Sequence, residues 1–94
     1  MGIRNAISLS GKEDIMQEKI EERHKEIVRI QNIIWGMYRE FLKEQDMGEY
    51  NRRKDELAKE YLKKGDKLLF EFCKNLLFDW APVMNRFAKD FGLQ

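Results

Sequence analysis

The sequence is short of the residues that build covalent frameworks, metal centres and phosphate-binding loops. Cys73 is its one cysteine, so no internal disulfide can form. His24 is its one histidine, whereas a zinc site needs three or four converging ligands that usually include further His or Cys. The six glycines are scattered and make no phosphate-cradling loop. We therefore expect no disulfide scaffold, no metal and no cofactor.

Long hydrophobic runs are also missing. No apolar run exceeds three residues, as in Leu76-Leu77-Phe78, whereas a membrane span needs about 20. The first fourteen residues lack the apolar core of a signal peptide, and Ala6 stands where a myristoylation signal needs Ser or Thr. We expect a cytoplasmic protein that does not associate with a membrane.

The sequence has no excess of charge of one sign. Its 18 Lys and Arg against 17 Asp and Glu give a net charge of +1, and the segments 1–45, 46–66 and 67–94 are each nearly balanced. Nonspecific binding to phosphate backbones depends on a basic excess. The overall charge therefore gives no support to a nucleic-acid-binding role.

What is present suits a small helical protein. The 94 residues are 43% hydrophobic and 37% charged, and they include eleven aromatic residues that need a dry environment. A chain of this length forms one domain and buries only about 60–65% of the surface that its unfolded form exposes. We expect a single domain over residues 1–94 with a thin core, in which residues 1–10 form a loose leader.

The hydrophobic spacing predicts a long first helix over residues 11–44, capped by Ser10. A seam with alternating four- and three-residue steps runs along it, and only Arg23 interrupts the series. Its members are Met16, Ile20, Ile27, Ile30, Ile34, Met37 and Phe41. From Ile27 onward a second stripe appears at Val28, Trp35 and Leu42, so this half needs neighbours on more than one side. The N-terminal half should project from the body or pair thinly.

Two further helices follow. Asp46 predicts the start of a helix over 47–64, which Lys63, Lys64 and Gly65 should end. Asp66 can cap a third helix from Lys67, and Pro82 should kink this helix or start a new one capped by Asp79. No segment alternates with a period of two residues. The predicted fold is therefore all-α, a three-helix bundle with a long first helix and a third helix kinked or broken near Pro82.

The residue types do not favour catalysis. Cys73 lies among Phe70, Phe72 and Leu76, where a reactive thiolate is disfavoured, so we interpret it as a core thiol. Most carboxylates have basic neighbours and lie on charged helix faces, whereas a general acid or base needs a desolvated cleft. We expect that the protein is not an enzyme and has no small-molecule substrate.

Two binding surfaces are candidates. The apolar residues of the last third exceed what a thin bundle readily covers, which favours burial against another protein or a second copy in a homodimer, although the first helix could absorb them. The predicted apolar anchors are Trp35, Phe70, Trp80 and Phe87, with Glu18, Glu22 and Arg23 as a polar rim. The alternative is nucleic-acid binding by a basic strip of Arg52, Arg53, Lys54, Lys63 and Lys64, although acidic residues are interleaved with it.

These observations favour a non-enzymatic protein that acts through protein–protein contact, as an adaptor or inhibitor. Stand-alone helical proteins of this size are common among phage and mobile-element products that block a host machine. That origin is an analogy of size and helical content, since no residue in this sequence specifies it.

Overall fold

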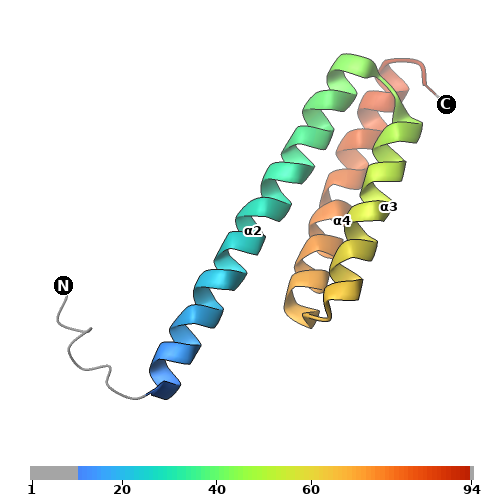
Figure 1. Cartoon of the computed structure of the whole chain (residues 1–94). Helices are drawn as coiled ribbons and strands as arrows, with labels where there is room; N and C mark the ends of the chain where they lie inside the picture. The colour runs from blue at the N-terminus through green and yellow to red at the C-terminus, as the bar shows by residue number, and fades with distance from the viewer. Residues whose placement is uncertain (1–10, 94) are drawn as a thin grey trace, which may run out of the picture.

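The computed structural model describes residues 11–93, with side chains from Asp14 onward, and in this range the chain forms three helices and no strand. Helix α2 spans Gly11–Glu44, α3 spans Met47–Lys64 and α4 spans Lys67–Asp90. The helices run up, down and up again, so α2 and α4 point the same way and α3 runs against them (Figure 1). The predicted all-α three-helix fold is confirmed. The expected leader and the Ser10 cap lie outside the described residues.

A tight turn joins α2 to α3. The backbone of Gln45 takes a left-handed conformation at φ 55°, and its amide donates to the Phe41 carbonyl at 2.7 Å. Asp46 is extended, and its carboxylate accepts from the Glu49 amide at 3.0 Å, so it caps α3 as the sequence predicts. Two residues therefore suffice to reverse the chain.

The turn from α3 to α4 is equally short. Gly65 ends α3 at φ 80°, a conformation that side chains with a Cβ rarely adopt, and its amide donates to the Leu62 carbonyl. The carboxylate of Asp66 then accepts from the Leu69 amide at 3.3 Å and caps α4. Both predicted helix boundaries are confirmed.

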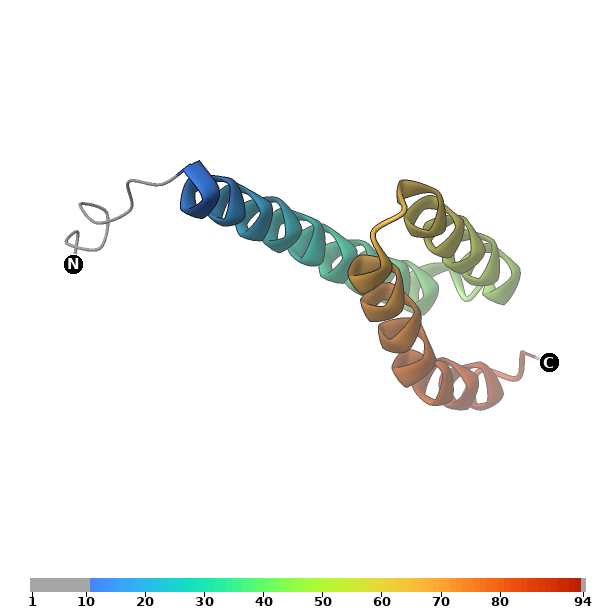
Figure 2. The same ribbon diagram turned by 90° about the horizontal axis from the view of Figure 1, so that it is seen from below.

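Helix α4 remains one helix through Pro82. The proline ring lacks the amide that would donate to the Phe78 carbonyl, and Figure 2 shows the helix bending between its first and second halves. The expectation of a kink is correct, whereas a break is not found. Asp79 lies inside the helix and caps nothing, so the alternative of a new helix that starts there is wrong. The helix ends where Gly92 takes a φ of 78°.

The core is a row of buried side chains where the three helices face one another. Tyr61, Ile30, Ile34, Met84 and Cys73 are the largest side chains that are almost completely enclosed. Within α2 the buried seam comprises Ile30, Ile34, Met37 and Phe41, as the four-and-three spacing predicts. Because the α3–α4 hairpin is shorter than α2, it covers only the C-terminal part of this seam.

The N-terminal part of α2 projects beyond the hairpin, and we call residues 11–25 the arm (Figures 1 and 2). Every side chain from Asp14 to Lys25 is exposed. The molecule measures 59 × 29 × 18 Å, and its radius of gyration of 18.0 Å exceeds the value of about 12 Å expected for a compact domain of this length. The expected projection of the first half of the long helix is therefore present.

Candidate interaction surface

Four aromatic rings from α2 and α4 form a continuous surface, which we call the aromatic face: Trp35, Tyr38, Trp80 and Phe87. Tyr38 is at its centre. The centroid of its ring lies 4.8 Å from that of Trp80, 5.3 Å from that of Trp35 and 6.0 Å from that of Phe87. The two tryptophan rings meet edge to face at 6.3 Å. Contacts in this range are attractive in addition to the area that they bury, so the rings hold one another in place.

The bundle does not enclose the aromatic residues of α4. The α4 residues that are buried against α2 and α3 are Leu69, Cys73, Leu77, Met84 and Ala88. The aromatic residues of α4 remain half-buried, except Phe78, which is 66% exposed. Trp35 on α2 is 52% exposed. A large part of the aromatic surface therefore faces solvent.

Aliphatic residues extend the aromatic face along both helices. Val28 lies two turns before Trp35 on α2 and is 40% exposed, and Val83 lies between Trp80 and Phe87 on α4 and is 41% exposed. Positions seven apart, or three and four apart, share one side of a helix. Val28 belongs to the second apolar stripe of α2, and Val83 lies on the matching side of α4. Helix α3 covers neither residue.

The structure brings together three of the four predicted anchors. Trp35, Trp80 and Phe87 meet through Tyr38, a residue that the sequence reasoning did not single out. Phe70 lies elsewhere: its half-buried ring has the Lys74 ammonium 5.5 Å from its centroid. Phe70 lies in the first turn of α4, ten residues or about 15 Å along the helix from Trp80.

The predicted polar rim does not surround the aromatic face. Glu18, Glu22 and Arg23 lie on the arm, and Arg23 is twelve residues or about 18 Å along α2 from Trp35. The guanidinium of Arg23 donates to both carboxylate oxygens of Asp66, at 3.0 and 3.4 Å. Arg23 thus joins the base of the arm to the start of α4.

An open hollow of about 700 Å³ lies in the angle between the arm and the α3–α4 turn. Arm residues Lys19 and Glu22 line one side, and Gly65, Asp66 and Leu68 line the other. Leu68 is 53% exposed, so the hollow has an apolar wall at the start of α4. Glu22 and Arg23 therefore belong to this second surface.

A polar network at Tyr61 joins α2 to α3. Tyr61 is completely buried, its hydroxyl donates to a carboxylate oxygen of Glu26, and it accepts from Arg29 at 2.7 Å. Arg29 also donates to both carboxylate oxygens of Glu60, at 2.7 and 3.2 Å. The ammonium of Lys64 lies 3.3 Å from Glu26 and 4.7 Å from the centroid of the Tyr61 ring. All five groups therefore have partners.

The charges of this network follow from its contacts. The hydrogen bond from Tyr61 lowers the pKa of Glu26, and the hydrogen bond from Arg29 lowers the pKa of Glu60. Burial raises the pKa of the Tyr61 hydroxyl. These contacts fix the position of α2 against α3, with the hydroxyl donating to Glu26 and accepting from Arg29.

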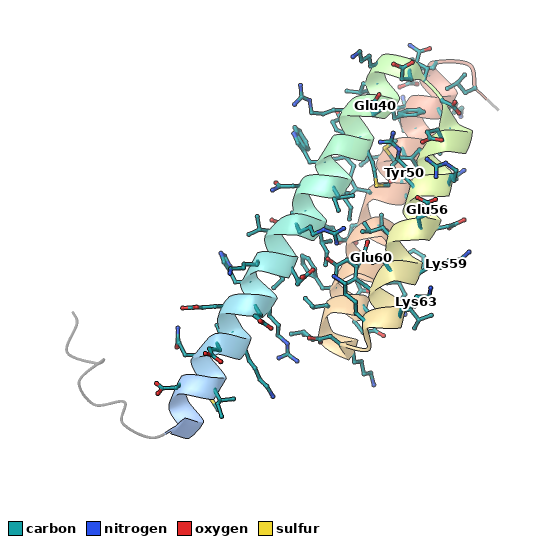
Figure 3. All side chains as sticks on the ribbon, in the orientation of Figure 1. Glu40, Tyr50, Glu56, Lys59, Glu60 and Lys63 are labelled. Atoms are coloured by element: carbon teal, nitrogen blue, oxygen red, sulfur yellow. The ribbon has the colours of Figure 1, made fainter. Side chains whose placement is uncertain are left out.

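The predicted basic strip is largely neutralised by its own acidic neighbours. Glu49 accepts from Arg52 at 2.5 Å and from Arg53 at 2.9 Å, and these contacts lower the pKa of Glu49 to about 2. Lys64 is engaged by Glu26 and Glu60. Lys54 is half-buried, whereas Lys63 is exposed. Figure 3 shows Lys59 and Lys63 on the side of α3 that faces away from α2.

Cys73 is completely buried, as its apolar neighbours predict, and burial raises the pKa of its thiol. Across the described residues, no group of three or more His, Cys, Asp or Glu side chains is placed to hold a metal ion. Nor is any helix in residues 11–93 both long enough and apolar enough to cross a membrane.

The sequence contains a signal for Tyr38 but none for the Tyr61 network. Tyr38 follows Trp35 by three residues, a spacing that places both on one side of α2. The partners of Tyr61 are 32 and 35 residues away in the sequence, and only the turn geometry brings them together. Comparisons of the chain with protein-family models, with curated proteins and with solved structures gave no match.

Proposed function

We propose that this protein is a cytoplasmic, non-enzymatic adaptor or inhibitor that acts through protein–protein contact and forms a homodimer. The aromatic face is the surface that would bind a partner protein, with Trp35 and Trp80 as its central anchors. Large aromatic side chains dominate the binding energy at many protein interfaces. The proposal extends to a phage or mobile-element product that blocks a host machine.

The observation that supports this proposal is the exposure of aromatic and aliphatic residues on one side of the bundle. Trp35, Val28 and Val83 are each at least 40% exposed and lie along the same pair of helices. Contiguous apolar surface of this kind is typical of interaction sites in soluble proteins. Mutual contacts already fix the four rings, so little side-chain freedom would be lost on binding.

Capture of partners from a cell extract tests the proposal with a matched pair of variants. Trp35→Ser removes a half-exposed ring from the aromatic face, whereas Phe78→Ser removes a 66% exposed ring from the opposite side of α4. Phe78 and Trp80 are two residues apart, which places them about 160° apart around the helix. Trp35→Ser should lose a stoichiometric protein partner that the wild type and Phe78→Ser retain.

The outcome of this experiment can contradict the proposal in two ways. Equal capture by both variants would remove the aromatic face from the binding site. A wild-type chain that binds no protein and stays monomeric at all concentrations would refute protein contact as its function. Circular dichroism of the wild type and of both variants checks that each protein keeps its helices.

Nucleic-acid binding through α3 remains the alternative proposal. Within the described part of the chain Lys59 and Lys63 make no ion pair, and they lie on the outer side of α3 (Figure 3). A phosphate-dependent complex should weaken steeply as salt rises, whereas an apolar interface should hardly change. Lys59→Glu with Lys63→Glu should abolish such binding, and unchanged affinity would exclude this strip.

A further inference from the structure

The arm exposes two apolar residues that belong to a seam. Met16 is 60% exposed and Ile20 is 56% exposed, although both continue the spacing that is buried farther along α2 at Ile30 and Ile34. Along the body, the seam packs against the α3–α4 hairpin. Along the arm, the hairpin has already ended, so the same side of the helix faces solvent (Figure 1).

The spacing of the seam indicates what could cover it. Steps of four and three residues are the repeat by which one α-helix packs its side chains between those of another. Met16, Ile20 and Arg23 therefore take the positions that face a partner helix. The hollow beside Leu68 lies at the base of the arm, where the end of such a helix would be received.

We propose that the arm pairs with the arm of a second copy of this chain, antiparallel and about a two-fold axis at residue 18. This inference rests on the proposed homodimer and assigns it a surface separate from the aromatic face. In this register Met16 faces Ile20 of the second copy and Ile20 faces its Met16. Residue 11 of each chain then lies beside residue 25 of the other, so the two arms overlap over their whole length.

The charges of the arm permit this pairing. Residues 11–25 contain four Lys and Arg and five Asp and Glu, so each arm is almost neutral and two arms do not repel one another strongly. Gln17 and Lys19 flank the seam, and the axis brings each residue near its copy. The glutamine pair is neutral and has no electrostatic cost, whereas the two Lys19 ammonium groups repel one another and weaken the dimer.

The size of the contact sets the expected strength of the dimer. Fifteen helical residues span about 22 Å, and only two apolar side chains from each chain are covered. Stable interfaces bury at least about 1,200 Å² in total, and smaller contacts are weak or transient. The arm dimer should therefore dissociate on dilution and form at high protein concentration.

Sedimentation velocity over a series of protein concentrations tests whether the arm is the dimer interface. Ile20→Glu places a charge in the seam and should abolish the dimer, lowering the association constant at least about tenfold, the factor that corresponds to 1.4 kcal/mol. Ile15→Glu is a matched control, because Ile15 is 57% exposed and lies on the same arm about 140° around the helix from Ile20. A control chain that dissociates as fully as Ile20→Glu would overturn the assignment.

Single cysteines test the register. Gln17→Cys lies next to its copy across the axis and should form a covalent dimer on oxidation. His24→Cys is on the same side of α2, seven residues later, but its copy is about 18 Å away and it should remain monomeric. Cys73 is buried and does not compete for the reaction. Cross-linking of both variants, or of neither, would overturn the antiparallel pairing at residue 18.

The two proposals fail in different ways. Loss of the dimer in Ile20→Glu with retained partner capture would support the arm as the surface for self-association. A dimer that persists in Ile20→Glu but is lost in Trp35→Ser would overturn this inference and leave the homodimer itself intact. A chain that is monomeric at every concentration would overturn the arm dimer, whereas partner capture would then decide the proposed function alone.

Discussion

Two buried tyrosines of α3 have opposite hydrogen-bonding situations. The Tyr61 hydroxyl contacts both Glu26 and Arg29, whereas the Tyr50 hydroxyl is buried and has no hydrogen-bond partner among the described residues. A satisfied buried hydroxyl stabilises the fold, and an unsatisfied one costs the free energy of its lost hydration. The same chemical change should therefore have opposite effects at these two residues.

We expect Tyr61→Phe to lower the free energy of unfolding by about 1–2 kcal/mol, because two hydrogen bonds to charged groups are lost while Glu26 and Arg29 keep other partners. Tyr50→Phe should raise it, by about 1 kcal/mol, because it removes only the unpaired hydroxyl. Urea unfolding of both variants and the wild type measures the two changes. A loss of equal size in both would contradict the assignment of the hydrogen bonds.

The carboxylates of the Tyr61 network make stability depend on pH. The pKa values of Glu26 and Glu60 are lowered in the folded protein from an ordinary value of 4.5, so the unfolded chain binds protons first as the pH falls. Their contribution is complete above pH 4.5 and is lost as the pH falls through the lower folded-state values. We expect Glu26→Gln to reduce the decrease in unfolding free energy as the pH falls below 4.5, and urea unfolding at a series of pH values measures this change.

At the scale of the helices, glycine has opposite effects on stability inside a helix and at a helix end. Gly36 lies inside α2 with open space around its Cα, whereas Gly65 ends α3 at a positive φ. We expect Gly36→Ala to raise the free energy of unfolding by about 0.5–1 kcal/mol through higher helix propensity. Gly65→Ala should lower it by about 1–2 kcal/mol through backbone strain. Thermal unfolding of both variants checks the sign at each position.

The helices and their ends could be predicted because their signals are local. Asp46, Gly65 and Asp66 act within four residues of their own positions, and the α2 seam needs only its spacing. The relative positions of the anchors could not be predicted, because the placement of Phe70 and Trp80 depends on which side of α4 meets α2. The position of the polar rim could not be predicted either, because no sequence signal shows that the α3–α4 turn lies beside Arg23.

At the scale of the whole molecule, the arm and the aromatic face would produce dimers of different shape. Two molecules of 59 Å that share an overlap of about 22 Å form a rod close to 100 Å long. Pairing through the aromatic face would instead thicken the body with little gain in length. Small-angle X-ray scattering at high protein concentration should therefore report the longer particle, which Ile20→Glu should shorten to that of one chain.

The unbroken course of α2 from the core to the tip has a mechanical consequence. Residues 30–41 of α2 pack against α3 and α4, and the arm continues from them in the same helix, with no glycine or proline between Lys12 and Lys25. A tilt of this packed part of α2 by a few degrees therefore displaces the N-terminal end of the arm farther than it displaces the residues in the core. A ligand that shifts Trp35 would move the tip of the arm, and the Arg23–Asp66 ion pair and the Tyr61 network oppose that movement.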